Sequence, residues 1–240
     1  QLSTTLLQIE NEFYGTIRPK RTIRKGERPL AALASSGVEY VEVRCLDLNP
    51  YLPVGIDAEQ IRFLDAFLLH CLLSDSPDDS GAESRELVAN QQRVVEAGRK
   101  PGVTLARAGG EVALHEWATT LMNETRPIAG LLDDVACGND YAASWSEQMS
   151  RLDDPDRTPS ARILADMRKA RAPFFRFAMN QSILHKGYFV ANPLSPDKLR
   201  HFETLAEQSI AEQHALETAD TQSLDDFLAH YLVPPSIGNM

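Results

Sequence analysis

The chain has 240 residues, of which 43% are hydrophobic, and its 24 basic and 34 acidic side chains give a net charge of −10. This length can bury a core without disulfide or metal support, and the acidic balance argues against binding of the whole chain to nucleic acid or anionic lipid. Three scattered cysteines, and no apolar run near the roughly 20 residues that span a bilayer, predict a cytoplasmic protein without a membrane segment. Because the chain opens on Gln1, without an initiator methionine, we expect a piece of a longer protein.

The first 56 residues differ in pattern from the rest of the chain. Apolar and polar side chains alternate over residues 7–14 and again over residues 38–44, as in strands with one buried face. In the second run Glu42 and Arg44 share a face, because side chains in a strand alternate with a period of two. We therefore expect an α+β fold, with strands over residues 1–56 and a mostly helical region over residues 57–240.

Helical spacing dominates from residue 57 onward. Asp57, followed three residues later by Gln60, has the form of a capping box at the start of a helix. An acidic loop over residues 74–81 ends this first helix. The spacing of apolar residues predicts further helices near residues 83–98, 112–122, 141–152, 160–170, 196–216 and 224–231.

Positive charge gathers between Arg18 and Arg28, where six basic residues and one acidic residue give a local charge of +5. Guanidinium and ammonium groups match phosphate oxygens, so one interpretation of this segment is an anion site. A solvated basic loop is the alternative. Nucleic acid is disfavoured, because the segment lacks interleaved aromatic side chains and the rest of the chain is acidic.

Glu42 and Arg44 are a second candidate for chemistry. A carboxylate on a sheet face can bind Mg²⁺, and an arginine two residues later can hold a phosphoryl group. A structural ion pair is the alternative interpretation of this pair. The six histidines show no metal-ligand spacing in the sequence, and we find no glycine spacing of a phosphate-binding loop.

Several motifs together resemble the bacterial glutamate–cysteine ligases. The run Gln8-Ile9-Glu10-Asn11-Glu12-Phe13-Tyr14 is followed by Ile17-Arg18-Pro19-Lys20-Arg21, and the family's strand stands here as Glu39-Tyr40-Val41-Glu42-Val43-Arg44. The continuation through Asn49-Pro50-Tyr51 is also similar to a strand and turn of the glutamine synthetases, distant relatives among the carboxylate–amine ligases. Ser160-Ala161-Arg162 looks like a further landmark, and the resemblance is loose beyond residue 165.

The resemblance implies the C-terminal half of such an enzyme, with part of a glutamine synthetase-like antiparallel catalytic sheet. That enzyme would join the γ-carboxylate of L-glutamate to the amino group of L-cysteine, the first step of glutathione biosynthesis. It would use ATP and Mg²⁺ and pass through an acyl phosphate, in which the carboxylate oxygen has become a good leaving group.

The matched motifs also imply roles for single residues. Glu42 would be a metal ligand, Arg44 would be the catalytic residue that holds the transferred phosphoryl group, and Tyr14 would contact the cysteine substrate. The nucleotide phosphates would lie near Arg18, Lys20 and Arg21. The other metal-binding carboxylates belong to the N-terminal half of the enzyme, which is missing here, so we expect the chain alone to be inactive. The alternatives are a non-catalytic module that binds an anionic partner and a ligase of the same superfamily that uses another amine.

Overall fold

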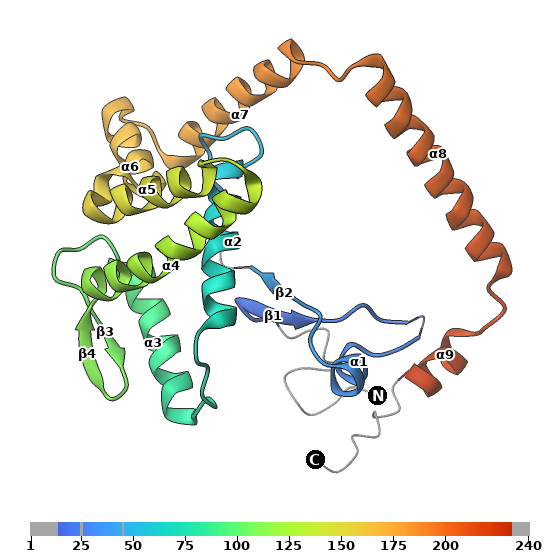
Figure 1. Cartoon of the computed structure of the whole chain (residues 1–240). Helices are drawn as coiled ribbons and strands as arrows, with labels where there is room; N and C mark the ends of the chain where they lie inside the picture. The colour runs from blue at the N-terminus through green and yellow to red at the C-terminus, as the bar shows by residue number, and fades with distance from the viewer. Residues whose placement is uncertain (1–13, 25, 45, 232–240) are drawn as a thin grey trace. The chain divides into compact units, whose positions relative to one another are not determined.

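A computed structural model of the chain describes residues 14–231 except residues 25 and 45 (Figure 1). The chain divides into two compact units. The strand unit joins Gln1–Asp47 to Pro193–Met240, and the helical unit is Leu48–Asn192. The predicted strand over residues 7–14 lies almost wholly outside the described residues. The division into a sheet portion up to residue 56 and a helical region after it stays a prediction.

The α+β class is confirmed. Helices dominate the described residues, and the described strands form two separate antiparallel pairs. Where a helix was predicted, a helix is present in each case. Most ends differ by a few residues, but the helix expected over residues 112–122 continues to Ala136. Within the residues that the structure describes, no helix is both long enough and apolar enough to cross a membrane.

The strand unit is built on a two-stranded ribbon. Strand β1 (Ile17–Lys20) pairs antiparallel with β2 (Tyr40–Val43), so that Arg18 lies opposite Glu42. Strand β1 overlaps the basic segment, and the interpretation of that segment as a loop is therefore wrong for Arg18, Pro19 and Lys20. The connection between the strands holds α1 (Pro29–Ser36), which begins on a proline and ends at Gly37, where φ is +73°. Such a φ favours glycine.

Two further helices complete the strand unit. Helix α8 (Pro196–Ala219) begins at Ser195, whose hydroxyl accepts a hydrogen bond from the Lys198 amide. Helix α9 (Leu224–Tyr231) begins behind Ser223, whose hydroxyl accepts a hydrogen bond from the Asp226 amide at 3.1 Å. Side-chain acceptors satisfy amides that a helix start leaves without partners, which explains these boundaries.

Three helices form the core of the helical unit: α2 (Ala58–Leu73), α4 (Leu114–Ala136) and α5 (Asp140–Asp153). Ala66, Ile128 and Ala129 are buried at their contact. Asp57 and Gln60 make both hydrogen bonds of the predicted capping box at the start of α2. The core helix α2 thus follows from two features of the sequence, which are the capping box at its start and the apolar stripe along one side.

A second ribbon was not predicted. Strand β3 (Thr104–Arg107) pairs with β4 (Gly110–Ala113), and the ribbon packs on α3 (Gly81–Ala97). The two linking residues, Ala108 and Gly109, have φ values of +51° and +77°. A two-residue turn of this kind usually has asparagine or aspartate before the glycine. Because Ala108 stands at that position, the sequence lacks the usual pattern of a hairpin turn. Asn90 of α3 holds the ribbon by accepting from the Ala106 amide at 2.8 Å and donating to its carbonyl at 2.7 Å.

The helical unit ends with the short 3₁₀ turn η2 (Pro155–Arg157), α6 (Pro159–Ala170) and α7 (Phe174–Ala191). Helix α6 begins at Thr158, whose hydroxyl accepts from the Ala161 amide, and was predicted. Helix α7 was missed. It has no side-chain cap at its start, and its apolar residues follow one another on all sides instead of forming one stripe.

Candidate functional site

The β1–β2 ribbon places four of the predicted site residues on one face. Arg18 lies opposite Glu42, and Lys20 lies two residues further along β1 on the same face, because side chains alternate along a strand. The Arg44 amide donates to the Thr16 carbonyl at 2.8 Å, so the ladder continues just past β2. The polar ribbon face, defined as Arg18, Lys20, Glu42 and Arg44, therefore has a fixed register.

Glu42 lies between two cations on this face. Its Oε2 atom is 3.0 Å from Lys20 Nζ, and its Oε1 atom is 2.7 Å from Arg44 Nε. The hydrogen bonds from Arg44, followed by that from Lys20, lower the pKa of the Glu42 carboxyl to about 2. Glu42 is consequently a carboxylate at any physiological pH.

Arg44 holds Glu42 with two donors, since its second contact runs from Nη2 to Oε2 at 3.1 Å. This fork-to-carboxylate arrangement raises the pKa of Arg44 and fixes the plane of the guanidinium. The Arg44 Cζ atom also lies 5.2 Å from the centroid of the Tyr14 ring, within the range of a cation–π contact. The structure therefore brings Tyr14 beside Arg44, two residues for which the sequence predicts different roles.

Arg21 points elsewhere. One of its Nη atoms donates to the Ser36 carbonyl at 2.8 Å, and its Nε atom lies 3.7 Å from Glu39 Oε2. The Thr22 amide donates to Glu39 at 2.9 Å, and this hydrogen bond, together with Arg21, lowers the pKa of Glu39. Arg21 thus ties the basic segment to the end of α1, and its contacts are separate from those around Glu42.

The described residues do not form a magnesium site by themselves. Residues 14–231, without 25 and 45, contain no group of three or more His, Cys, Asp or Glu side chains suited to hold a metal ion. Both oxygens of Glu42 contact cations, as described above. Mg²⁺ prefers about six oxygen ligands, and one carboxylate binds it weakly. The role of Glu42 as a metal ligand stays a prediction and needs ligands from other residues.

The turn that follows β2 is anchored inside the helical unit. The Tyr51 hydroxyl donates to Asp166 Oδ2 of α6 at 2.7 Å, and the Arg162 guanidinium stacks over the Tyr51 ring at 4.2 Å. His185 Nε2 of α7 donates to the Pro50 carbonyl at 2.8 Å. The two landmarks Asn49-Pro50-Tyr51 and Ser160-Ala161-Arg162 are thus in contact. Their resemblance to the ligases was a signal, but nothing in the sequence indicated that they meet.

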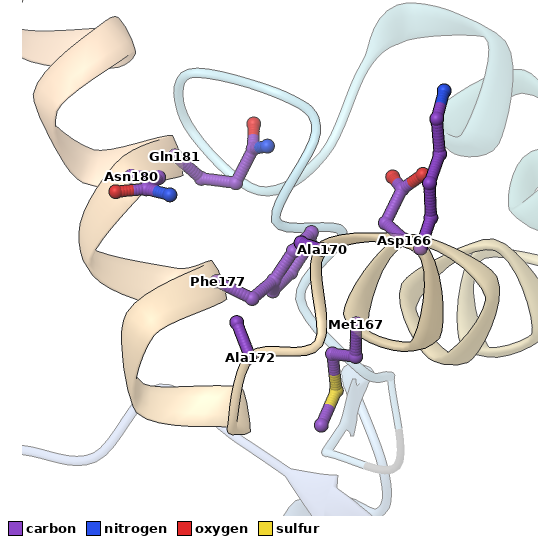
Figure 2. A pocket seen from close by; sticks show the side chains of 8 residues that line it. Asp166, Met167, Ala170, Ala172, Phe177, Asn180 and Gln181 are labelled. Atoms are coloured by element: carbon purple, nitrogen blue, oxygen red, sulfur yellow. The ribbon is translucent and has the colours of Figure 1, made fainter.

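A pocket of about 400 Å³ lies between α6 and α7 (Figure 2). Apolar side chains including Met167 and Phe177 line it, together with four polar ones, which are Asp166, Lys169, Asn180 and Gln181. This pocket was not predicted, because one of the two helices that form its walls, α7, was itself missed. The pocket is therefore mainly apolar and has polar side chains in its lining.

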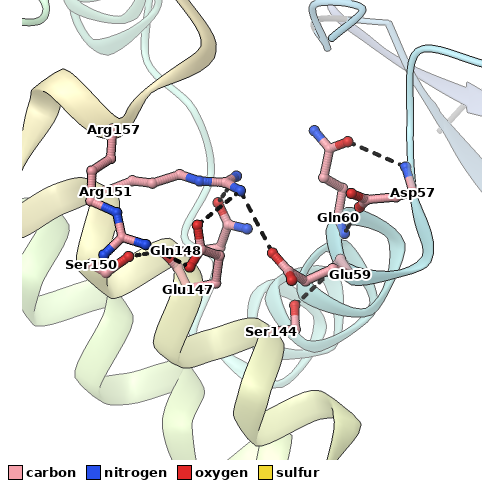
Figure 3. A network of polar contacts seen from close by, with 9 residues as sticks. All are labelled: Asp57, Glu59, Gln60, Ser144, Glu147, Gln148, Ser150, Arg151 and Arg157. Carbon is pink, nitrogen blue, oxygen red and sulfur yellow. Dashed lines mark hydrogen bonds and ion pairs between the residues drawn. The ribbon is translucent and has the colours of Figure 1, made fainter. Parts of the chain in front are cut away.

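A polar network joins the start of α2 to α5 (Figure 3). Arg151 lies 3.6 Å from Glu59 and 3.2 Å from Glu147, and Arg157 lies 3.0 Å from Glu147. The Ser144 hydroxyl donates to the Glu59 carbonyl at 2.5 Å. Burial, and then the nearby Glu147, raise the pKa of Glu59. These contacts pair every charge with an opposite one and stabilise helix packing, which is a structural role.

Comparison with known proteins finds glutamate–cysteine ligases among the similar proteins. The family described as glutamate–cysteine ligase matches residues 1–94. The glutamate–cysteine ligase of Pseudomonas entomophila is 48% identical over 231 residues, which are 96% of this chain and 44% of the relative. That of Azotobacter vinelandii is 47% identical over the same shares. A crystal structure of the Francisella tularensis glutamate–cysteine ligase in complex with AMP superposes with a TM-score of 0.85 at 31% identity, and the match covers 96% of this chain and 45% of that one.

The chain thus resembles the glutamate–cysteine ligases over almost its whole length, as its motifs predicted. It spans less than half the length of the curated relatives that it matches, and it corresponds to a C-terminal part of them.

Proposed function

We propose that this chain acts as the C-terminal part of an ATP-dependent glutamate–cysteine ligase, which joins the γ-carboxylate of L-glutamate to the amino group of L-cysteine. The identity of 48% across almost the whole chain carries the proposal. The polar ribbon face supports it, because it gathers Glu42, Arg44 and two further cations where the resemblance expects the chemistry.

The reaction would proceed in two transfers. The γ-phosphoryl group of ATP moves to a γ-carboxylate oxygen of glutamate and forms an acyl phosphate, leaving ADP. The cysteine nitrogen then attacks the carbonyl carbon, phosphate leaves with the electron pair of its C–O bond, and the nitrogen loses a proton. A carboxylate oxygen is a poor leaving group, whereas phosphate is a good one, which is why ATP is needed.

Arg44 would hold the transferred phosphoryl group. A guanidinium has five N–H donors in one plane, and Glu42 engages the Nε and Nη2 donors of Arg44. This contact fixes the direction of the fork before substrate arrives, so no ordering of the side chain is needed during the transfer. Tyr14, beside Arg44, would contact the cysteine substrate.

Arg18, Lys20 and Arg21 would attract the phosphates of the nucleotide. The complex of the Francisella tularensis ligase with AMP supports nucleotide binding in the family. Mg²⁺, when bound, would neutralise the phosphates of ATP. The described residues offer one carboxylate on the ribbon face, so we propose Glu42 as one Mg²⁺ ligand and the N-terminal part of a complete ligase as the source of the others.

The test is reconstitution. Residues 1–240 are co-expressed with the segment of the Pseudomonas entomophila relative that precedes its matched region, and γ-glutamylcysteine is measured with ATP, Mg²⁺, glutamate and cysteine. We expect product that depends on all four, and none from either part alone. Competition among cysteine, other amino acids and ammonia separates a cysteine ligase from one that uses another amine. A stable complex that forms no peptide with any amine would leave the non-catalytic anion-binding module as the better interpretation.

A further inference from the structure

Lys20 reaches Glu42 on a diagonal across the ribbon. In the register of β1 and β2, Glu42 lies opposite Arg18 and Lys20 lies opposite Tyr40, so Lys20 and Glu42 are diagonal neighbours on one face. Their Nζ and Oε2 atoms are nevertheless 3.0 Å apart, and the two side chains are 30% and 36% exposed. Lys20 is therefore part of the polar ribbon face and does not simply extend into solvent.

Donors occupy most of the Glu42 carboxylate. A carboxylate has about four acceptor sites, two on each oxygen. Arg44 Nε occupies one site on Oε1 at 2.7 Å, and Arg44 Nη2 and Lys20 Nζ share Oε2 at 3.1 and 3.0 Å. Among the described residues, these contacts leave one site on Oε1 for a further partner, which is compatible with the predicted role of Glu42 as a metal ligand. Lys20 thus holds Oε2 together with Arg44 and restrains rotation of the carboxylate.

Lys20 also changes the charge that surrounds Arg44. One carboxylate paired with one guanidinium has no net charge, and such a pair attracts a phosphoryl group only weakly. Because Lys20 shares the same carboxylate, the group of Lys20, Glu42 and Arg44 has two cations and one anion, and is therefore positive. Positive charge that is already in place stabilises the negative charge of a phosphoryl group during its transfer.

The contact with Glu42 determines which edge of Arg44 is directed elsewhere. Arg44 uses Nε and Nη2 toward Glu42, so the Nη1 hydrogens and the second Nη2 hydrogen point away from the carboxylate. The outer hydrogens of Nη1 and Nη2 form a parallel pair at the end of the guanidinium, and such a pair matches two oxygens of a phosphoryl group. The direction of this pair depends on the plane of the Glu42 carboxylate.

We infer that Lys20 is a positioning residue for Arg44. By holding Oε2 of Glu42, Lys20 fixes the carboxylate plane and leaves the end of Arg44 with the excess positive charge that the phosphoryl group requires. The charge of Lys20 still adds to the general attraction of phosphates. The alternative is a direct bond from Lys20 to a nucleotide phosphate, and the two roles differ in their dependence on Glu42. The inference rests on the proposed function for the identity of the transferred group.

The first part of the test follows Arg44 in residues 1–240, without turnover. Nuclear magnetic resonance measures how fast the Arg44 Nε hydrogen exchanges with solvent. In Lys20→Met we expect exchange at least about threefold faster, because the carboxylate that accepts this hydrogen is less restrained. Lys20→Arg should restore slow exchange. The matched control is Arg24→Met, which removes one positive charge from an exposed position of the same basic segment and should leave the exchange unchanged.

The same measurement in a Glu42→Gln background separates positioning from other effects. If Lys20 acts through Glu42, Lys20→Met should have no further effect on Arg44 in that background, whereas independent effects would add. Lys20→Gln is a second substitution that also removes the charge. Circular dichroism checks that all variants keep their helices.

The second part of the test uses the reconstituted ligase. Lys20→Met should lower kcat by at least about tenfold and change the KM for ATP by less than about threefold, because the restraint on Arg44 matters most during the transfer. Lys20→Arg should recover most of the turnover. A raised KM for ATP with unchanged kcat would overturn the inference in favour of a direct phosphate contact.

The exchange measurement can also overturn the inference. Unchanged Arg44 exchange in both Lys20→Met and Lys20→Gln would do so, as would an equal change in Arg24→Met or an undiminished effect of Lys20→Met beside Glu42→Gln. The proposed function fails separately. If Arg44 exchange responds as expected but the reconstituted complex forms no γ-glutamylcysteine, the restraint on Arg44 remains and the reaction is removed.

Discussion

Glu42 illustrates how a single carboxylate can be prepared for chemistry that it does not carry out alone. Its oxygens contact Lys20 from the opposite strand and Arg44 from its own strand. The shared face of Glu42 and Arg44 was predicted from strand alternation. The contribution of Lys20 was not, because it depends on the register of two strands separated by the whole α1 connection. The same connection decides that Arg21 turns to Glu39, a contact that local pattern could not indicate.

The first prediction concerns the ionisation of Glu42. Replacing Arg44 with glutamine should raise the pKa of Glu42 from about 2 toward its ordinary value of 4.5, because the Arg44 hydrogen bonds are the largest cause of the low value. Lys20→Gln should raise it less. A pH titration of the Glu42 carboxyl carbon by nuclear magnetic resonance measures both shifts. Since the lowered pKa belongs to the folded state, the stabilisation by this group is present above pH 4.5 and is lost as pH falls through 2. An unchanged titration midpoint of Glu42 in Arg44→Gln would contradict the hydrogen bonds between Arg44 and Glu42.

The second prediction concerns the shape of Arg44. In the reconstituted ligase, Arg44→Lys should lower turnover by roughly 10²-fold, because a point ammonium cannot hold Glu42 and a phosphoryl group with a planar fork. The matched control is Arg93→Lys on α3, an arginine of the helical unit that donates to the Thr104 carbonyl and lies near Glu111. Initial rates of peptide formation provide the measurement. Near-normal turnover in Arg44→Lys would favour the alternative interpretation, in which Glu42 and Arg44 form a purely structural ion pair.

The helices show which parts of the fold a sequence can reveal. Asp57 with Gln60, and Ser223, are caps whose partners lie three residues away, and the helices behind them were predicted. The β3–β4 ribbon and α7 depend on other information. Ala108 adopts a positive φ, which is uncommon for alanine, and the apolar residues of α7 do not form a single stripe. The β3–β4 ribbon and α7 were therefore missed because they depend on tertiary contacts.

The third prediction tests one of these local signals. Asp57→Ala removes the acceptor that the Gln60 amide uses at 2.9 Å, and should lower the free energy of unfolding by about 1 kcal/mol. Asp57→Asn retains an acceptor at the same position, so it is the control and should cost less. Urea denaturation followed by circular dichroism measures the difference. Equal stability of the alanine and asparagine variants would show that the cap does not stabilise α2.

The fourth prediction concerns the chain by itself. Residues 1–240 alone should form no γ-glutamylcysteine, because one carboxylate on the ribbon face cannot anchor the Mg²⁺ that neutralises ATP. The cations Arg18, Lys20 and Arg21 should still bind ATP weakly, and this binding should fade as salt screens them. Calorimetric titration of the chain with ATP at low and high salt tests this binding. We expect Lys20→Met to bind ATP more weakly, and Lys186→Met on α7 is the control. Product above that of a heat-treated sample would show that the chain is catalytically complete.

The hydrogen bond from Tyr51 to Asp166 makes the absorbance of Tyr51 a probe of how often its turn opens. Burial, followed by the hydrogen bond to Asp166, raises the pKa of Tyr51 from 10.0 to about 12, so the stabilisation by this phenol is full below pH 10 and declines as pH rises through 12. A phenolate absorbs at longer wavelength than a phenol. After a rapid jump to alkaline pH, solvent-exposed tyrosines should change absorbance at once, whereas Tyr51 should follow in a later phase, when its turn leaves α6. With six tyrosines in the chain, that phase should carry about one sixth of the signal and vanish in Tyr51→Phe, which makes its rate a direct reading of how often the turn opens.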